Sequence, residues 1–154
     1  MKAVTPSLNL EAYTGAYTSD DGYLPVTLCT TQSKSAQCHN VISDFATVDD
    51  STELATNLYG SFHTIWTSHL RLQHFSGDSF NFTFTALFPH GYGQNTSGFS
   101  GFELEGGWVE FQVDKRKGVV EGFSLVVDED AYAARVRKLG GPLSKTADAW
   151  FRKV

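Results

Sequence analysis

The chain has 154 residues, of which 41% are hydrophobic, and its formal net charge is −5. This hydrophobic content excludes a disordered chain, and the acidic balance argues against a nucleic-acid-binding or anionic-membrane surface. No apolar run approaches the roughly 20 residues of a membrane span, and residues 1–13 contain no apolar signal-peptide core. The length predicts a single domain, residues 1–154, that is able to bury a core. Twelve Phe and six Tyr against one Met favour a β-rich domain.

The chain begins with two strand candidates joined by a turn. The strands are Tyr13–Thr18 and Tyr23–Cys29, and Asp20-Asp21-Gly22 between them is a turn signal. Pro25 lacks the N–H that a sheet ladder needs, which suggests an edge position for the second strand.

Cys29 and Cys38 enclose a polar, turn-like segment of eight residues. A disulfide can close so small a loop if the segment turns, and it would stabilise the fold by roughly 2–3 kcal/mol. In an oxidising environment we expect this bridge, and in a reducing compartment we expect two free thiols.

The next segments carry weaker patterns. Apolar residues in Val41–Val48 match a helical face, so either a short helix or an irregular strand is expected there. Leu54–Tyr59 is either a short strand or a turn.

A hairpin over residues 61–88 is the clearest pattern in the chain. An extended segment, Ser61–Phe75, leads through the turn Ser76-Gly77-Asp78 to a second strand, Phe80–Phe88, that pairs back onto it. Along the second strand the aromatic residues alternate with polar ones, which places Phe80, Phe82 and Phe84 on one face. Three phenylalanines on one face predict a thick aromatic interior.

The second half of the chain adds a loop, a hairpin and helical segments. Pro89–Gly101 is rich in glycine and polar residues and is expected to be a loop. Trp108–Val113 and Val119–Val127 form a hairpin whose charged turn ends in glycine. Asp130–Leu139 has helical propensity but no strong apolar face.

Three glycine and proline residues, Gly140-Gly141-Pro142, break that helix, and Ser144 is expected to cap a last turn before residues 149–151. The sum is seven or eight strands in sequential hairpins, with one or two short helices. This order predicts an all-β protein, an antiparallel barrel of about eight strands, because closure removes exposed edges. Such an interior is either filled by side chains or holds one small ligand.

The common catalytic and metal-binding motifs are missing. The sequence has no Ser-x-x-Lys, Gly-x-Ser-x-Gly, phosphate-binding loop, His-Glu-x-x-His or Cys-x-x-Cys. His63 and His69 would share one face of a continuous strand at roughly 20 Å, which is too far apart to share a metal ion. We therefore predict no metal site.

Several polar and aromatic residues are candidates for a ligand site. If Leu70 and Leu72 face inward, His74 is drawn into a pocket; alternatively it lies near the mouth and satisfies a backbone carbonyl. His90 and Tyr92 lie between glycines, so they either line a ligand entrance or belong to a long hairpin connection. The candidate ligand-binding residues are Arg71, His74, Phe80, Phe82, Phe84, His90, Tyr92 and Trp108.

Several segments also resemble a known family. They are Leu10–Thr18 (LEAYTGAYT), the strand that ends at Cys29, Ser43–Asp49 (SDFATVD), Trp66–Leu72 (WTSHLRL), Ala86–Gly93 (ALFPHGYG) and Ala147–Val154 (ADAWFRKV). In this order they resemble the lipocalin-like barrel that follows the catalytic domain in fungal serine β-lactamase-like (penicillin-binding-protein-like) proteins.

The resemblance implies a lipocalin-like fold, a fungal origin, a secreted parent protein and an oxidised Cys29–Cys38 pair. In that family the nucleophilic serine and its lysine belong to the preceding domain, so no catalytic residue maps onto this chain and hydrolase activity is not carried over.

Three functions follow as expectations. The first is a non-catalytic barrel, without a cofactor, that binds a small apolar or aromatic molecule. The alternative is a free-standing enzyme that cyclises or isomerises a small molecule in a fungal biosynthetic pathway. That chemistry needs a dry, shaped pocket and one or two hydrogen-bond donors, here Arg71, His74, His90 or Tyr92. The third is a domain that docks on a protein partner such as a hydrolase domain.

Overall fold

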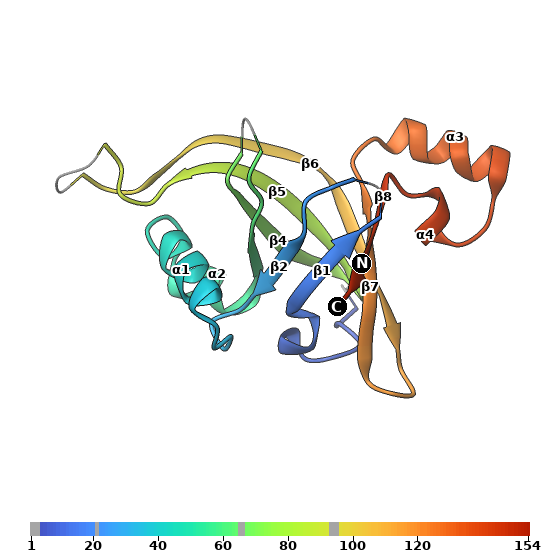
Figure 1. Cartoon of the computed structure of the whole chain (residues 1–154), viewed down its shortest axis with the longest axis horizontal. Coiled ribbons are helices and arrows are strands. Elements are labelled where there is room, and N and C mark those ends of the chain that lie inside the picture. Colours follow the sequence, from blue (N-terminus) through green and yellow to red (C-terminus); the bar gives the residue numbers. More distant parts are fainter. Residues whose placement is uncertain (1–3, 21, 65–66, 93–95) are drawn as a thin grey trace.

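Eight antiparallel strands form a closed barrel in which each strand pairs with its neighbours in sequence and the last pairs with the first (Figure 1). The computed structural model describes residues 4–20, 22–64, 67–92 and 96–154. The strands are β1 Gly15–Ser19, β2 Val26–Cys29, β3 Leu58–Ser61, β4 His69–Ser76, β5 Ser79–Phe88, β6 Phe99–Asp114, β7 Val119–Val126 and β8 Ala149–Lys153. This is the up-and-down architecture that lipocalins share, and it confirms the predicted fold class.

Five short helical segments accompany the barrel in the part of the chain that the structure describes. They are the 3₁₀ helix η1 Leu10–Tyr13 and the α-helices α1 Ala36–Phe45, α2 Ser51–Thr56, α3 Glu129–Leu139 and α4 Leu143–Thr146. No helix among the described residues has the length and apolar character needed to cross a membrane.

The two ends of the barrel differ. Because consecutive strands run antiparallel, the β1–β2, β3–β4, β5–β6 and β7–β8 connections lie at one end, which we call the mouth. The tight β4–β5 and β6–β7 turns lie at the other end, which we call the closed end. Gly77 and Gly118 adopt positive φ angles in these two turns, as predicted for turn glycines.

The N-terminal segment seals the closed end. Tyr13 of η1 is fully buried, its ring packs 4.9 Å from Phe111, and its hydroxyl donates to Asp78 in the β4–β5 turn. Burial, and then the hydrogen bond to Asp78, raise the pKa of Tyr13 to about 12. Burial on its own would raise the pKa of Asp78, but hydrogen bonds from Tyr13 and Ser7 outweigh it and lower that pKa. The segment is therefore anchored by charge-assisted hydrogen bonds.

The barrel interior is aromatic, as predicted. Phe80 and Phe82 of β5 are almost fully buried, and Phe84 is partly buried against the same core. Neighbouring strands add Phe123 and Phe151, whose rings stack with centroids 4.8 Å apart. Pairs of this kind stabilise by about 0.5–1.5 kcal/mol beyond the area they bury.

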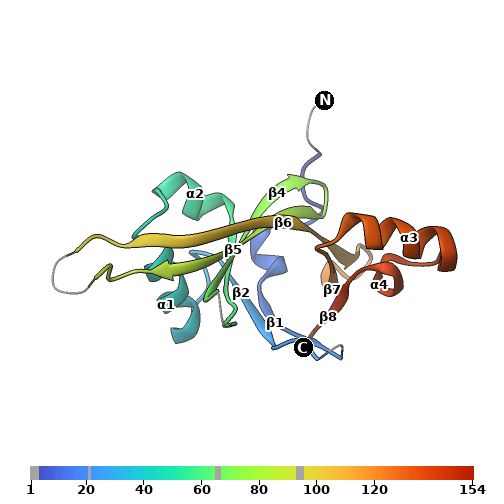
Figure 2. The same ribbon diagram turned by 90° about the horizontal axis from the view of Figure 1, so that it is seen from above.

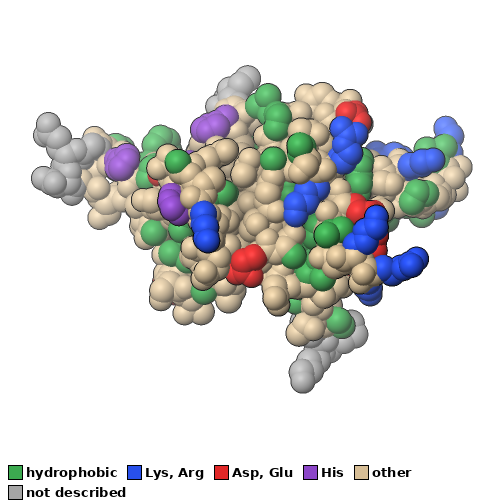
Figure 3. Space-filling model, turned by 60° about the horizontal axis from the view of Figure 1, so that its bottom comes forward, with side chains coloured by type: hydrophobic (Ala, Val, Ile, Leu, Met, Phe, Trp, Pro, Cys, Tyr) green, Lys and Arg blue, Asp and Glu red, His purple; other side chains and the backbone are tan. Residues whose placement is uncertain are grey.

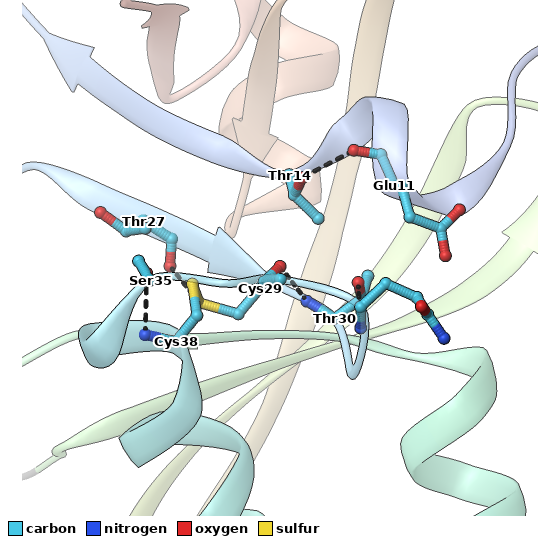
Figure 4. Close-up of a disulfide and its surroundings, with 9 residues drawn as sticks. Glu11, Thr14, Thr27, Cys29, Thr30, Ser35 and Cys38 are labelled. Atoms are coloured by element: carbon cyan, nitrogen blue, oxygen red, sulfur yellow. Dashed lines mark hydrogen bonds between the residues drawn. A yellow bond between two sulfur atoms is a disulfide. The ribbon is translucent and has the colours of Figure 1, made fainter.

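Helix α1 packs on the outside of the barrel and is tied to it covalently. Ser35 caps the helix by accepting from the Cys38 N–H, and Cys38, Val41 and Phe45 form its buried face. Cys38 is bonded to Cys29 at the end of β2, with 5.4 Å between the Cα atoms (Figure 4). Of the two structures expected for residues 41–48, the helix is therefore the right one. The two cysteines form the expected disulfide and are not free thiols.

Part of the β5–β6 hairpin extends beyond the barrel as an arm (Figures 1 and 2). The β6–β7 pairing begins at Trp108, so residues 99–107 of β6 pair only with β5. The sequence predicted this strand only from residue 108, because Gly98, Gly101 and two further glycines interrupt the apolar alternation of residues 98–107. Extending β6 to Phe99 corrects that prediction and shortens the expected loop.

Three smaller predictions are wrong, and a fourth is right only in part. The segment 61–75 is not one strand, because β3 ends at Ser61, β4 begins at His69, and the described residues between them belong to no strand. The short strand expected in Leu54–Tyr59 is right only from Leu58, where β3 begins, because the residues up to Thr56 belong to α2. Pro25 marks no sheet edge, because it precedes β2 in a closed barrel. Ser144 does not cap α4, whose N-cap is Pro142.

Helix α3 has no buried residue, and it is held at the barrel by polar contacts and by an aromatic contact between Tyr132 and Trp108. Asp128 caps it by accepting from Ala131 N–H, and Arg135 bonds the carbonyl of Thr146 and the carboxylate of Asp148. Figure 3 shows most Lys and Arg side chains of the displayed face on the half that carries α3 and α4. The helix predicted at Asp130–Leu139 is confirmed.

Candidate functional site

The candidate site is a small cavity in the mouth half of the barrel. Its lining residues are all apolar and come from the β3–β4 loop and from strands around the barrel: Val26, Phe62, Leu70, Leu72, Phe84, Val109, Phe123, Leu125 and Phe151. The alternation of each strand turns these side chains inward, and the antiparallel register brings them to one level. The cavity has a volume of about 20 Å³.

Two stacked rings cover this cavity on the mouth side. Phe62 lies in the β3–β4 loop, and its ring stacks on Phe84 of β5 with centroids 5.2 Å apart and planes 26° apart. Both rings are only partly buried. Across the mouth, the ring of Tyr23 lies 6.0 Å from that of Phe151 and is 43% exposed. The rim is thus aromatic and solvent-accessible.

The loop that carries Phe62 is closed by local hydrogen bonds. Phe62 N–H donates to the carbonyl of Ser68, and Thr64 N–H donates to that of Thr67. Because Phe62 belongs to a loop, its side chain is not fixed by a sheet ladder as Phe84 is. Phe62 is therefore the covering residue that can move with the least disruption of the barrel.

Arg71 does not face the cavity. It lies on the outer face of β4 beneath α1 and α2, where its Nε and Nη2 bond the two oxygens of Asp49 at 2.9 and 2.6 Å. Tyr59 donates to the same carboxylate, and the guanidinium lies 5.2 Å from the centre of the Phe45 ring. Burial alone would lower the pKa of Arg71, but Asp49 more than offsets it and raises that pKa. Arg71 stays charged and is committed to this contact.

The other polar candidates are dispersed. His74 lies at the closed end, where Nε2 donates to the carbonyl of Gly77 and the ring contacts Phe80. His90 and Tyr92 follow β5 at the tip of the arm, and Tyr92 is 88% exposed with its ring against Phe99. Trp108 lies on β6, and its ring meets that of Tyr132 on α3 edge to face at 5.6 Å.

Of the predicted ligand-binding residues, only Phe84 lines the cavity; Phe80 and Phe82 pack in the core beside it. Phe62 and Phe151 also line the cavity, and the sequence pattern does not reveal either of them. Phe62 was assigned to a continuous strand, and Phe151 reaches the cavity only through the β8–β1 closure, which no local pattern reveals. The position of Arg71 on the strand face opposite Leu70 and Leu72 already indicated that its side chain points out of the barrel.

The distance between His63 and His69 also differs from the prediction. His63 lies in the β3–β4 loop and His69 at the start of β4, and their ring centroids are 6.4 Å apart instead of roughly 20 Å. Among the residues that the structure describes, no group of three or more His, Cys, Asp or Glu side chains is placed to hold a metal ion.

Comparison of the chain with protein-family models, with curated proteins and with solved structures finds no match. The site is therefore interpreted from its geometry alone.

Proposed function

We propose that this barrel binds a small apolar or aromatic molecule at its mouth. The observation that carries the proposal is the entirely apolar lining of the cavity, closed by the loop-borne ring of Phe62. Apolar cavities in proteins stay dry and accept apolar guests such as benzene. The aromatic rim at Tyr23 and Phe151 offers stacking partners to a planar ligand.

The size of the cavity determines how a ligand enters. A volume of about 20 Å³ is far below the roughly 300–1,000 Å³ of the pockets that hold small ligands in proteins. A ligand therefore occupies the space that Phe62 fills, and Phe62 swings outward with its loop. The unstacking of Phe62 from Phe84 opposes binding by about 0.5–1.5 kcal/mol.

Titration with a neutral fluorescent probe, N-phenyl-1-naphthylamine, tests this function. We expect saturable binding, and we expect Phe62→Ala to tighten it about 3- to 10-fold because the unstacking cost is removed. Phe75→Ala is the matched control, since Phe75 is 62% exposed on β4 and should leave binding unchanged. Absence of saturation in both wild type and Phe62→Ala would contradict the proposal.

The alternative of cyclisation or isomerisation gains no support from this cavity. Such an enzyme needs an acid, a base or a hydrogen-bond donor beside the substrate. None of the nine lining side chains carries one. The candidates Arg71, His74, His90 and Tyr92 lie elsewhere in the described structure.

We also propose that the barrel is related to the accessory domain of fungal serine β-lactamase-like proteins. What supports this is the eight-stranded antiparallel barrel together with the Cys29–Cys38 bridge. The genomic neighbourhood tests it: a serine hydrolase domain encoded upstream in the same reading frame supports the relation. A small-molecule biosynthetic cluster around the gene argues against it.

A further inference from the structure

Outside the barrel cavity, three side chains form a continuous hydrogen-bonded chain. Ser68 Oγ lies 2.7 Å from Nδ1 of His69, and Nε2 of His69 lies 2.8 Å from Oδ2 of Asp44. Ser68 and His69 are neighbours where the β3–β4 loop enters β4, and Asp44 comes from the last turn of α1. The three groups are of the types found in serine hydrolases.

The hydrogen bonds fix which atom carries which proton. A carboxylate only accepts, so Nε2 of a neutral His69 holds the proton and donates it to Asp44. Nδ1 is then an acceptor at 2.7 Å, and Ser68 Oγ–H donates to it in preference to its second acceptor, the carbonyl of Thr85, which is 3.5 Å away. The Leu87 N–H donates to the same Ser68 oxygen at 3.1 Å, which agrees with an oxygen whose own proton points elsewhere. His69 is thus arranged to act as a base toward Ser68.

The imidazole is held firmly in this position. His69 is 7% exposed, and its ring meets the buried ring of Phe45 edge to face at 5.3 Å. The N–H of Ser68 donates to the carbonyl of Thr85 on β5, which fixes the serine backbone. The Cys29–Cys38 bridge holds α1, and with it Asp44, against the barrel. Such preorganisation is what general-base catalysis requires.

Ser68 also opens onto a surface pocket. The pocket has a volume of about 240 Å³ and is lined by His63, Thr64, Thr67, Ser68, Ala86, Leu87 and Phe88. His63 lies on its wall, where a ring N–H can donate to an oxyanion, and Leu87 and Phe88 supply an apolar side. A small ester with an apolar acyl group matches this combination of volume and lining.

We propose that Ser68 is the nucleophile of a hydrolytic site for small carboxylic esters, with His69 as the base and Asp44 as the positioning residue. Ser68 Oγ attacks the carbonyl carbon while its proton passes to His69 Nδ1. The ester C–O bond then breaks, and the departing alkoxide takes that proton as the alcohol leaves. Water attacks the acyl-serine by the same route and releases the acid and Ser68. The two ring nitrogens are exchanged relative to the serine protease arrangement.

Hydrolysis of 4-nitrophenyl butyrate and covalent labelling with a fluorophosphonate test the proposal in the full chain. We expect labelling of Ser68 alone, located by peptide mass spectrometry, and a loss of kcat/KM of at least about 100-fold in Ser68→Ala. Ser43→Ala is the matched control, because Ser43 lies exposed on α1. No labelling of the wild-type protein, labelling at another residue, or unchanged hydrolysis in Ser68→Ala overturns the proposal.

A second variant separates catalysis from a merely structural role. Both native cysteines are in the disulfide, so Ser68→Cys places the single free thiol of the chain at this site. A thiol beside an imidazole base is partly ionised, so we expect iodoacetamide to alkylate it at neutral pH at least about 10-fold faster than Ser43→Cys. Combining Ser68→Cys with His69→Gln should lower the alkylation rate to that of Ser43→Cys. Equal rates in Ser68→Cys and Ser43→Cys overturn the assignment of His69 as base.

Discussion

At the scale of single residues, Arg71 and Asp49 form a buried ion pair with two hydrogen bonds. The two side chains are 9% and 4% exposed. The hydroxyl of Tyr59 donates a further hydrogen bond to the Asp49 carboxylate. Burial, and then this hydrogen bond, raise the pKa of Tyr59. This pair makes Arg71 a structural residue that joins β4 to the α1–α2 segment.

The pair can be tested by removing one charge and then both. We expect Asp49→Asn to lower the free energy of unfolding by about 3 kcal/mol, because it leaves a buried guanidinium without its counter-charge. The double variant Arg71→Leu with Asp49→Leu should be less destabilised than Asp49→Asn. Urea unfolding measures both. Asp20→Asn is the control, since Asp20 and Arg152 form an exposed pair, and it should change stability by less than about 0.5 kcal/mol. Equal loss in Asp49→Asn and Asp20→Asn would show that the buried pair contributes little.

At the scale of elements, the disulfide decides how firmly α1 is attached. Replacing both cysteines by alanine should lower the free energy of unfolding by about 2–3 kcal/mol, the value expected for a loop of this length. Amide hydrogen exchange should accelerate in α1 more than in β4 and β5, because the bridge joins α1 to β2. Thr31→Ala, in the same loop, keeps the bridge and serves as the control. Uniform acceleration across the barrel would contradict this local role.

The sequence predicted those elements whose pattern is local. The β4–β5 and β6–β7 hairpins were found because their strands alternate and their turns contain glycine. The break between β3 and β4 was missed because residues 62–68 contain no glycine or proline that would mark a turn. Helix α2 was missed because it has no buried residue and hence no periodic apolar face.

The same distinction holds for the site. Phe84 was identified from alternation within one strand. Phe62 and Phe151 were not, because their shared position depends on contacts between strands that are distant in the chain. The hydrogen-bonded residues Ser68, His69 and Asp44 form no sequence motif either. Asp44 reaches His69 only because α1 packs on the barrel.

At the scale of the whole molecule, one strand pair closes the barrel. β8 pairs with β1, which lies at the opposite end of the sequence, and with β7. Phe151 lies in both ladders, opposite Ser19 on one side and Phe123 on the other. The same side chain lines the mouth cavity. Closure of the barrel and formation of the proposed ligand site are therefore coupled.

Phe151→Ala tests this coupling. Phe151 is 1% exposed, so we expect its truncation to lower the free energy of unfolding by about 3–5 kcal/mol, whereas the exposed Phe75→Ala should cost less than about 0.5 kcal/mol. If the variant folds, the space left by the ring adds to the cavity, so N-phenyl-1-naphthylamine should bind more tightly than to wild type. Chemical unfolding and probe titration on the same samples measure both quantities. A stable variant with unchanged probe affinity would mean that the ring of Phe151 neither closes the barrel nor shapes the site.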